Sequence, residues 1–181
     1  VVFEAAALPT SNETGIAFDS SNNKVVITYP DSGNSSYGTA IVGTVSGTSI
    51  TFGTAVVFES ASSANTRAVY DSVAQKVSIA YRDVGNANYG TAIVGTVSGT
   101  SISFGTAAVF NTATSYNIEA TFDSNSNKVV IVFRNAGNSD YGTAIVGTVS
   151  GTSISFGSAA VFNSAASYSP ANVFDSSNNK V

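Results

Sequence analysis

The sequence has no cysteine, methionine, tryptophan or histidine, and only 3 prolines in 181 residues. Without cysteine there are no disulfides, thiolate metal ligands or thiol nucleophiles, and without histidine the commonest acid–base side chain is missing. Charge is also scarce, because 7 Lys and Arg and 11 Asp and Glu make up only 10% of the residues, against about 25% in soluble domains. Since acidic side chains outnumber basic ones, we expect no nucleic-acid partner.

No apolar run reaches the roughly 18 residues that a membrane helix needs, so we expect no membrane span. We also expect no cofactor. Abundant Ser, Thr, Asn and Gly, low charge and the absence of the readily oxidised Cys and Met are typical of exposed, durable proteins. The composition therefore favours an extracellular location, or one on the surface of a cell or a virion.

The dominant feature that is present is a repeat of 52 residues. The segment YGTAIVGTVSGTSITFGTAVVF begins at Tyr37, and near-identical copies begin at Tyr89 and Tyr141. A second motif, FDSSNNKV, begins at Phe18 and again at Phe174. We expect one array of about 3.5 copies that is a segment of a longer repeat chain. The repeats are 7–58, 59–110, 111–162 and the partial repeat 163–181.

Each repeat shows four strand-like runs and no helical periodicity. In the third repeat these runs are 118–123, 128–134, 141–149 and 152–162. They are rich in β-branched and aromatic residues, and Gly, Asn, Asp and Ser separate them. Four antiparallel strands in a repeat of this length are typical of a β-propeller blade. We predict an all-β fold of propeller blades, with a β-solenoid or stacked β-sandwich modules as the alternative.

The segment FDSNSNKVVIVFRNAGNSDYG, which begins at Phe122, resembles the blades of sialidase-like β-propellers. Those blades also have an Asp, a polar turn, an apolar strand that ends in Arg or Asp, and a Gly/Asn loop. The Asp-box of that family ends in Gly and Trp, and this chain has no Trp. The resemblance therefore implies the propeller fold and does not imply the family's activity.

Two connections differ between repeats while the third and fourth strands barely change. They are the loop between the second and third strands and the linker from the fourth strand to the next repeat. In a propeller both lie on one face, so they can form a ligand surface, although loops also drift without function. Aromatic rings there would stack on sugars, and charged groups would bind hydroxyls or a carboxylate. The candidate ligand-binding residues are Tyr37, Tyr89, Tyr141, Tyr116, Tyr168, Asp31, Asp83, Asp140, Arg82 and Arg134.

Two of these patterns have a simpler structural interpretation. Tyr37 and its two counterparts can open the third strand and pack between repeats. Asp123, Asn125 and Asn127 alternate like the ligands of a calcium loop, but no distal Glu completes the motif. An Asp-containing hairpin turn explains that spacing, so we expect no metal site.

We predict a non-enzymatic, multivalent binding module, most plausibly for glycans, because repetition adds avidity to weak sites. The alternative is a structural repeat array of an adhesin, appendage, filament or phage fibre, and the third hypothesis is a sialidase-like glycoside hydrolase. An active site needs different groups that converge on one point. Arg82 and Arg134 instead occupy one position in successive repeats, so we expect no enzyme. The expected partners are a glycan or cell-surface ligand and further repeats or copies of the chain.

Overall fold

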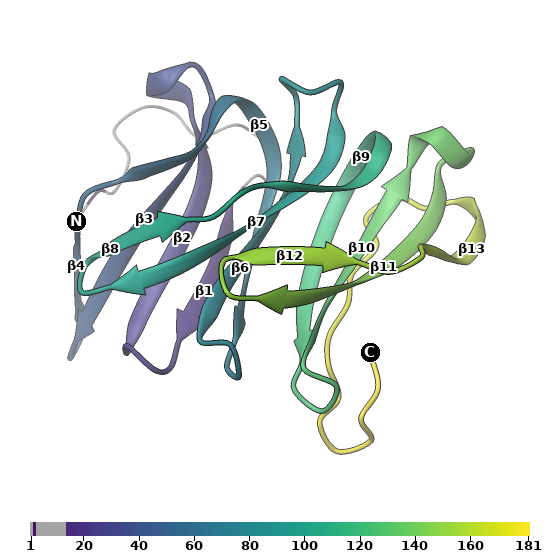
Figure 1. The fold of residues 1–181 in the computed structure, drawn as a ribbon. Helices are drawn as coiled ribbons and strands as arrows, with labels where there is room; N and C mark the ends of the chain where they lie inside the picture. The colour runs from purple at the N-terminus through teal and green to yellow at the C-terminus, as the bar shows by residue number, and fades with distance from the viewer. Residues whose placement is uncertain (1, 3–13) are drawn as a thin grey trace.

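The computed structural model describes residue 2 and residues 14–181. In this part of the chain β-strands hold 66% of the residues and there is no α-helix (Figure 1). None of its helical segments could cross a membrane. The strands are β1 (Gly15–Asp19), β2 (Lys24–Asp31), β3 (Tyr37–Ser46), β4 (Ser49–Phe52), β5 (Val56–Asp71), β6 (Lys76–Asp83), β7 (Tyr89–Ser98), β8 (Ser101–Phe104), β9 (Ala108–Asp123), β10 (Lys128–Asn135), β11 (Tyr141–Ser150), β12 (Ser153–Phe156) and β13 (Ala160–Ala166). Two short 3₁₀ turns are η1 (Ser32–Asn34) and η2 (Ala136–Asn138).

The strands form one open antiparallel sheet. Its hydrogen-bonded path runs β1-β2-β3-β5-β6-β7-β9-β10-β11-β12, while β4, β8 and β13 pair with β3, β7 and β11. The predicted all-β class is confirmed. The predicted propeller of four-stranded blades is wrong, and so is the resemblance to sialidase-like propellers, because the sheet neither closes nor curls.

The long strands β5 and β9 explain why separate blades do not form. Each has 16 residues and runs from one repeat into the next. The first part of β5 pairs with β3, and the part after Ser62 pairs with β6. Backbone pairing therefore continues across the repeat boundary, where the sequence predicted a loop. The predicted fourth strand at 152–162 is instead divided into β12 and the first residues of β13.

The hydrophobic core lies between neighbouring repeats, because each repeat presents one face to the repeat before it and the other to the repeat after it. Phe58 of the first repeat contacts Tyr81 of the second, with ring centroids 5.2 Å apart. Phe110 of the second repeat contacts Phe133 of the third at 5.2 Å. The first of these cores also includes Ala17, Val26, Ala40, Val42, Val77, Ile79, Ile93, Val97 and Ile102. The second also includes Ala80, Ala92, Val94, Ile118, Val129, Ile131, Ile145 and Ile154.

The β7–β8 hairpin lies against the first repeat and the β11–β12 hairpin against the second, and in each case a glycine makes room for the turn. A Cβ atom on Gly53 would lie 1.9 Å from the carbonyl oxygen of Thr100, in the turn between β7 and β8. Gly105 has the same relation to Thr152, also at 1.9 Å. The third copy, Gly157, has no such neighbour, since the nearest atom to its Cβ position is 3.9 Å away. These glycines are therefore contact points between repeats.

Candidate functional site

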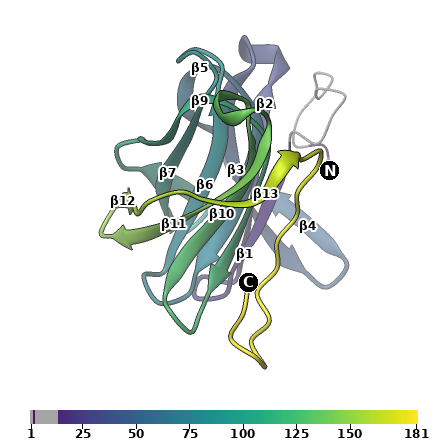
Figure 2. The ribbon, with the colours of Figure 1, turned by 90° about the vertical axis from the view of Figure 1, so that its right-hand side faces the viewer.

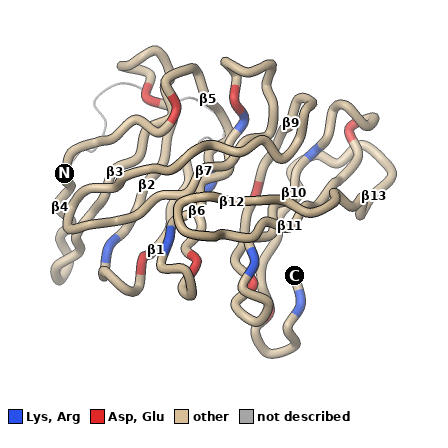
Figure 3. Tube along the Cα trace, in the orientation of Figure 1, with Lys and Arg blue, Asp and Glu red and all other residues tan. Residues whose placement is uncertain are grey.

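Charged residues gather at the two ends of the strands, and the middle of the sheet carries few (Figure 3). One end holds the hairpin turns β1–β2, β5–β6 and β9–β10. The other end holds the connections on which the sequence placed its ligand-binding candidates. We call it the loop edge. It comprises residues 31–37, 83–89 and 135–141 and the chain segments 59–65, 111–117 and 163–169.

The aspartates of the opposite end stabilise tight turns. The Asp19 carboxylate accepts the backbone N–H groups of Ser21 and Asn22, both at 3.0 Å. Asp123 does the same in the third repeat, and the N–H of Ser126 holds the pKa of its carboxyl below the usual value. The calcium-like spacing therefore builds a hairpin turn. The described residues include no group of three or more acidic side chains placed to hold a metal ion.

Tyr37, Tyr89 and Tyr141 are the first residues of β3, β7 and β11, and all three are half-buried. The backbone of Tyr37 pairs with that of Asp31, and Tyr89 pairs in the same way with the residue that ends β6. These tyrosines lie at strand starts and take part in none of the cation–π contacts described next. They open their strands, as the structural interpretation expects, and their role as ligand-binding residues stays a prediction.

Four of the predicted residues instead form a single stack. The Arg82 guanidinium lies 5.1 Å from the Tyr116 ring centre, and that of Arg134 lies 4.3 Å from the same ring. Arg134 also lies 5.1 Å from the ring of Tyr168. Asp140 forms an ion pair with Arg134, with Oδ1 3.4 Å from Nε. We call Arg82, Tyr116, Arg134 and Tyr168 the Arg–Tyr ladder.

The ladder joins one repeat to the next. Tyr116 pairs in register with Arg134 of its own repeat, while Arg82 belongs to the repeat before. Contacts of this kind are worth about 0.5–1 kcal/mol at exposed sites and more where water is excluded. The first repeat has Pro30 where the later repeats have arginine, and Ala64 takes the place of Tyr116. The ladder therefore begins only at the second repeat.

A partly buried acidic cluster lies on β5 and on β6, the strand that carries Arg82, and its central residue, Glu59, was not among the candidates predicted from the sequence. The hydroxyl of Tyr81 donates to Glu59 Oε2 at 3.0 Å, and the N–H of Ala61 donates to Glu59 Oε1 at 3.1 Å. Asp83 is only 7% exposed. Burial and the nearby Glu59 carboxylate raise the pKa of Asp83, and the same two causes raise the pKa of Tyr81.

The third repeat has a neutral version of this cluster. Asn111 replaces the glutamate, Asn135 replaces the aspartate and Phe133 replaces the tyrosine. The amide nitrogen of Asn111 donates to Asn135 Oδ1 at 3.2 Å and to Ser115 Oγ at 2.9 Å. The fold therefore accepts uncharged side chains at these positions. A comparison of the repeats at this position is the sequence signal that would have revealed Glu59.

Replacing Asp83 with asparagine is expected to flatten the dependence of stability on pH. A raised pKa means that the folded state favours the protonated carboxyl. The stability from this group is complete below the unfolded pKa of about 3.9 and is lost as the pH rises through the folded pKa. Urea unfolding of the wild type at rising pH should show this loss, and Asp83→Asn should lack it.

Asp123 gives the matched control with the opposite sign. Its pKa is lowered in the folded state, so its contribution is present above the unfolded pKa and is lost as the pH falls. Asp123→Asn should therefore reduce stability at neutral pH. It should not change the loss of stability that Asp83 causes as the pH rises. Identical pH profiles for the wild type and Asp83→Asn would contradict the role assigned to the acidic cluster.

A small polar hollow of about 220 Å³ opens where the second repeat, the third repeat and the C-terminal segment meet. Arg67 and Glu119 line it and form an ion pair with Nε 2.8 Å from Oε1. Asn65, Asn117 and residues 169–171 complete it. Its volume is below the about 300–1,000 Å³ of typical ligand pockets, and its charged groups already pair with each other.

No protein-family model matches this sequence, and neither the curated proteins nor the solved structures contain a match. The chemistry of the loop edge therefore has to be judged from its own geometry. That geometry joins arginine to tyrosine, arginine to carboxylate and tyrosine to carboxylate, in several cases across a repeat boundary. Three of these contacts, Arg82–Tyr116, Arg134–Tyr168 and Arg67–Glu119, join neighbouring repeats, whereas the Tyr81–Glu59 and Arg134–Asp140 contacts lie within one repeat.

Proposed function

We propose that the chain acts as a structural repeat array, in which the stacking of one repeat on the next is itself the function. One observation supports this above all: polar groups that the sequence offered to a ligand contact neighbouring repeats instead. Arg82 reaches Tyr116, and Arg134 reaches Tyr168, each at 5.1 Å. Such an array suits an adhesin stalk, an appendage or a phage fibre.

The apolar contacts support the same proposal. The 22-residue segments that begin at Tyr89 and Tyr141 differ at a single position, where one has Thr106 and the other Ser158. This segment supplies both a face that covers the preceding repeat and a face that the following repeat covers. In repeat arrays stability is approximately the sum of repeat and nearest-neighbour terms. Each added repeat should therefore add the same interface.

A chain with one added repeat tests the proposal. A second copy of residues 111–162, inserted directly after Phe162, should bury this ring and raise the midpoint of urea unfolding, because the insertion creates one new interface. The same insertion in a Phe162→Ala background is the matched control, and it should give a smaller rise. An unchanged midpoint after insertion would contradict the proposal, because it would mean that stacking contributes nothing.

Glycan binding remains the second candidate, and Tyr168 favours it. This side chain is 73% exposed, and one guanidinium group lies over its ring, whereas Tyr116 has two. The chain can be applied to an array of immobilised glycans together with its Tyr168→Ala variant. Binding that is lost in Tyr168→Ala and kept in Tyr141→Phe would place the ligand-binding role first. Absence of binding would leave the structural role.

A further inference from the structure

The outer face of the third repeat copies two faces that are buried elsewhere in the chain. Val42 and Val94 are 0% exposed under the repeats that follow them, but the equivalent Val146 is 43% exposed. Phe110 is 8% exposed, and the equivalent Phe162 is 56% exposed. We call this surface the C-face; it comprises Val130, Val132, Ala144, Val146, Gly157 and Phe162.

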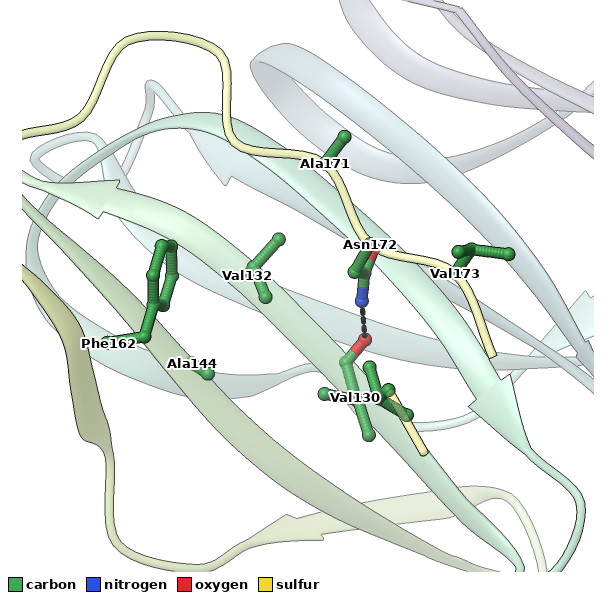
Figure 4. Close-up of a pocket in the computed structure, with 8 residues that line it drawn as sticks. Val130, Val132, Ala144, Phe162, Ala171, Asn172 and Val173 are labelled. Carbon is green, nitrogen blue, oxygen red and sulfur yellow. Dashed lines mark hydrogen bonds between the residues drawn. The ribbon is translucent and has the colours of Figure 1, made fainter. Parts of the chain in front are cut away.

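The C-face also has the shape of a contact between repeats. It borders an apolar hollow of about 620 Å³, lined by the side chains of Val132, Ala144 and Phe162 (Figure 4). The position of Gly157, which in the earlier repeats receives the hairpin turn of the next repeat, is open. An apolar surface without a specific partner would not also have an open glycine position that matches the hairpin contacts of the other repeats. The natural occupant is therefore another repeat of this sequence.

The opposite side of the molecule carries the complementary surface. Ile16, Phe18 and Val45 are 66%, 56% and 50% exposed; we call these three residues the N-face. In the second repeat the equivalent of Val45 is Val97, which is 7% exposed in the core shared with the first repeat. Tyr70, the equivalent of Phe18, packs on this core and donates a hydrogen bond to Ser21 across the junction at 2.6 Å.

The C-terminal tail shows which repeat fits the C-face. Residues 174–181 read FDSSNNKV, which is identical to residues 18–25. The tail lies beside the C-face (Figure 2), where Asn172 donates a hydrogen bond to the Val130 carbonyl at 3.0 Å. One isolated bridge, between Asp175 and Lys180, is its β-pairing, whereas β1 pairs with β2 over five residues. The tail thus lies where the equivalent of the β1–β2 hairpin belongs, but it does not pair as β1 and β2 do.

We propose that the 181-residue chain docks head to tail on a second copy of itself, with the N-face of one copy on the C-face of the other and the β1–β2 hairpin in place of the tail. In a chain that continues with a further repeat after Val181, that repeat takes the same site. This proposal rests on the stacking function proposed above. Docking replaces the tail, which holds one β-bridge, by residues 18–25 of the second copy, which have the same sequence and already belong to the β1–β2 hairpin. It also covers Phe162 and Val146 and fills the seat at Gly157. Because the two faces differ, each docked copy leaves one face open, and association continues beyond the dimer.

Two blocked variants test the docking. Phe162→Glu places a charge on the C-face, and Val45→Glu places one on the N-face; both side chains are exposed, so each variant should keep its fold, as circular dichroism can check. Sedimentation velocity should show concentration-dependent oligomers for the wild type and a monomer for each variant alone. An equimolar mixture of the two variants should form a one-to-one dimer and nothing larger, because one intact face remains on each.

Removal of residues 170–181 gives a second measurement. Without the tail the C-face is uncovered, so the shortened chain should associate at a lower concentration than the wild type. A monomeric mixture, or single variants that still associate, would overturn head-to-tail docking. If docking fails while the inserted repeat still raises the unfolding midpoint, repeats stack only within one chain. If the inserted repeat has no effect, the structural function itself fails.

Discussion

Replacing Phe110 with alanine is expected to lower the free energy of unfolding by about 3–5 kcal/mol. The side chain is 8% exposed, and its ring centre lies 5.2 Å from that of Phe133 and 5.7 Å from that of Phe156. Both partners belong to the next repeat, so the truncation leaves a cavity inside a junction. Urea unfolding at low protein concentration, followed by circular dichroism, measures the loss.

Phe162 provides the matched control, because it occupies the same position one repeat later. It is 56% exposed, so Phe162→Ala should cost only about 0.5 kcal/mol, in the range of surface substitutions. Both variants replace the same residue type, so the difference between their losses of unfolding free energy measures the effect of the following repeat. Equal losses would mean that the core contacts within a repeat, and not the junction, determine stability.

Replacing Gly105 with alanine is expected to cost about 1–3 kcal/mol, the range for overpacking a close contact. The added Cβ would meet the carbonyl oxygen of Thr152 at 1.9 Å, so the hairpin of the third repeat must move. The left-handed backbone region is not the cause, because this glycine is not among the residues with positive φ. Thermal or urea unfolding gives the comparison with the wild type.

The same substitution at Gly157 should be nearly silent, within about 0.5 kcal/mol. Its Cβ position has no atom closer than 3.9 Å. Gly157→Ala should still weaken the head-to-tail docking proposed above, because the hairpin turn of the second copy would meet the new methyl group. A large loss of monomer stability in Gly157→Ala would show that the glycine serves its own repeat.

Most strands could be predicted from the sequence, and the exceptions have a common cause. The predicted runs 128–134 and 141–149 correspond to β10 and β11 within one residue at their ends. The linker 111–117 is polar and reads as a loop, yet it is part of β9. Its backbone pairs first with β7 and then with β10. Pairing with distant strands decided its conformation, and local propensity does not contain that information.

The propeller prediction failed for a similar reason. Four strands in a repeat are visible in the residue pattern, whereas closure depends on the angle between successive repeats. In the structure, continuous strands such as β5 hydrogen-bond to strands on both sides of the repeat boundary. A repeat pattern shows that units stack and does not show how far they turn. The sequence therefore established the class and the repeat but not the architecture.

The sequence placed its ligand-binding candidates at the loop edge, and whether they bind a ligand stays a prediction. The structure brings Tyr116, Tyr168, Arg82 and Arg134 together in the Arg–Tyr ladder, which includes contacts between repeats. Glu59 was missed because a lone glutamate at a strand has no motif. The recognisable signal lies in positions that differ between otherwise identical repeats, where the structure finds the ladder, the acidic cluster and the ion pair of the polar hollow.

The central claim is that the C-face is a site for another repeat, and thiol labelling tests it most directly. The chain has no cysteine, so a Val146→Cys variant carries a single reporter on a side chain that is 43% exposed. We predict rapid labelling in the 181-residue chain and strong protection once a copy of residues 111–162 follows Phe162. Val94→Cys should be protected in both chains. Equally rapid labelling of Val146→Cys with and without the added repeat would contradict the account.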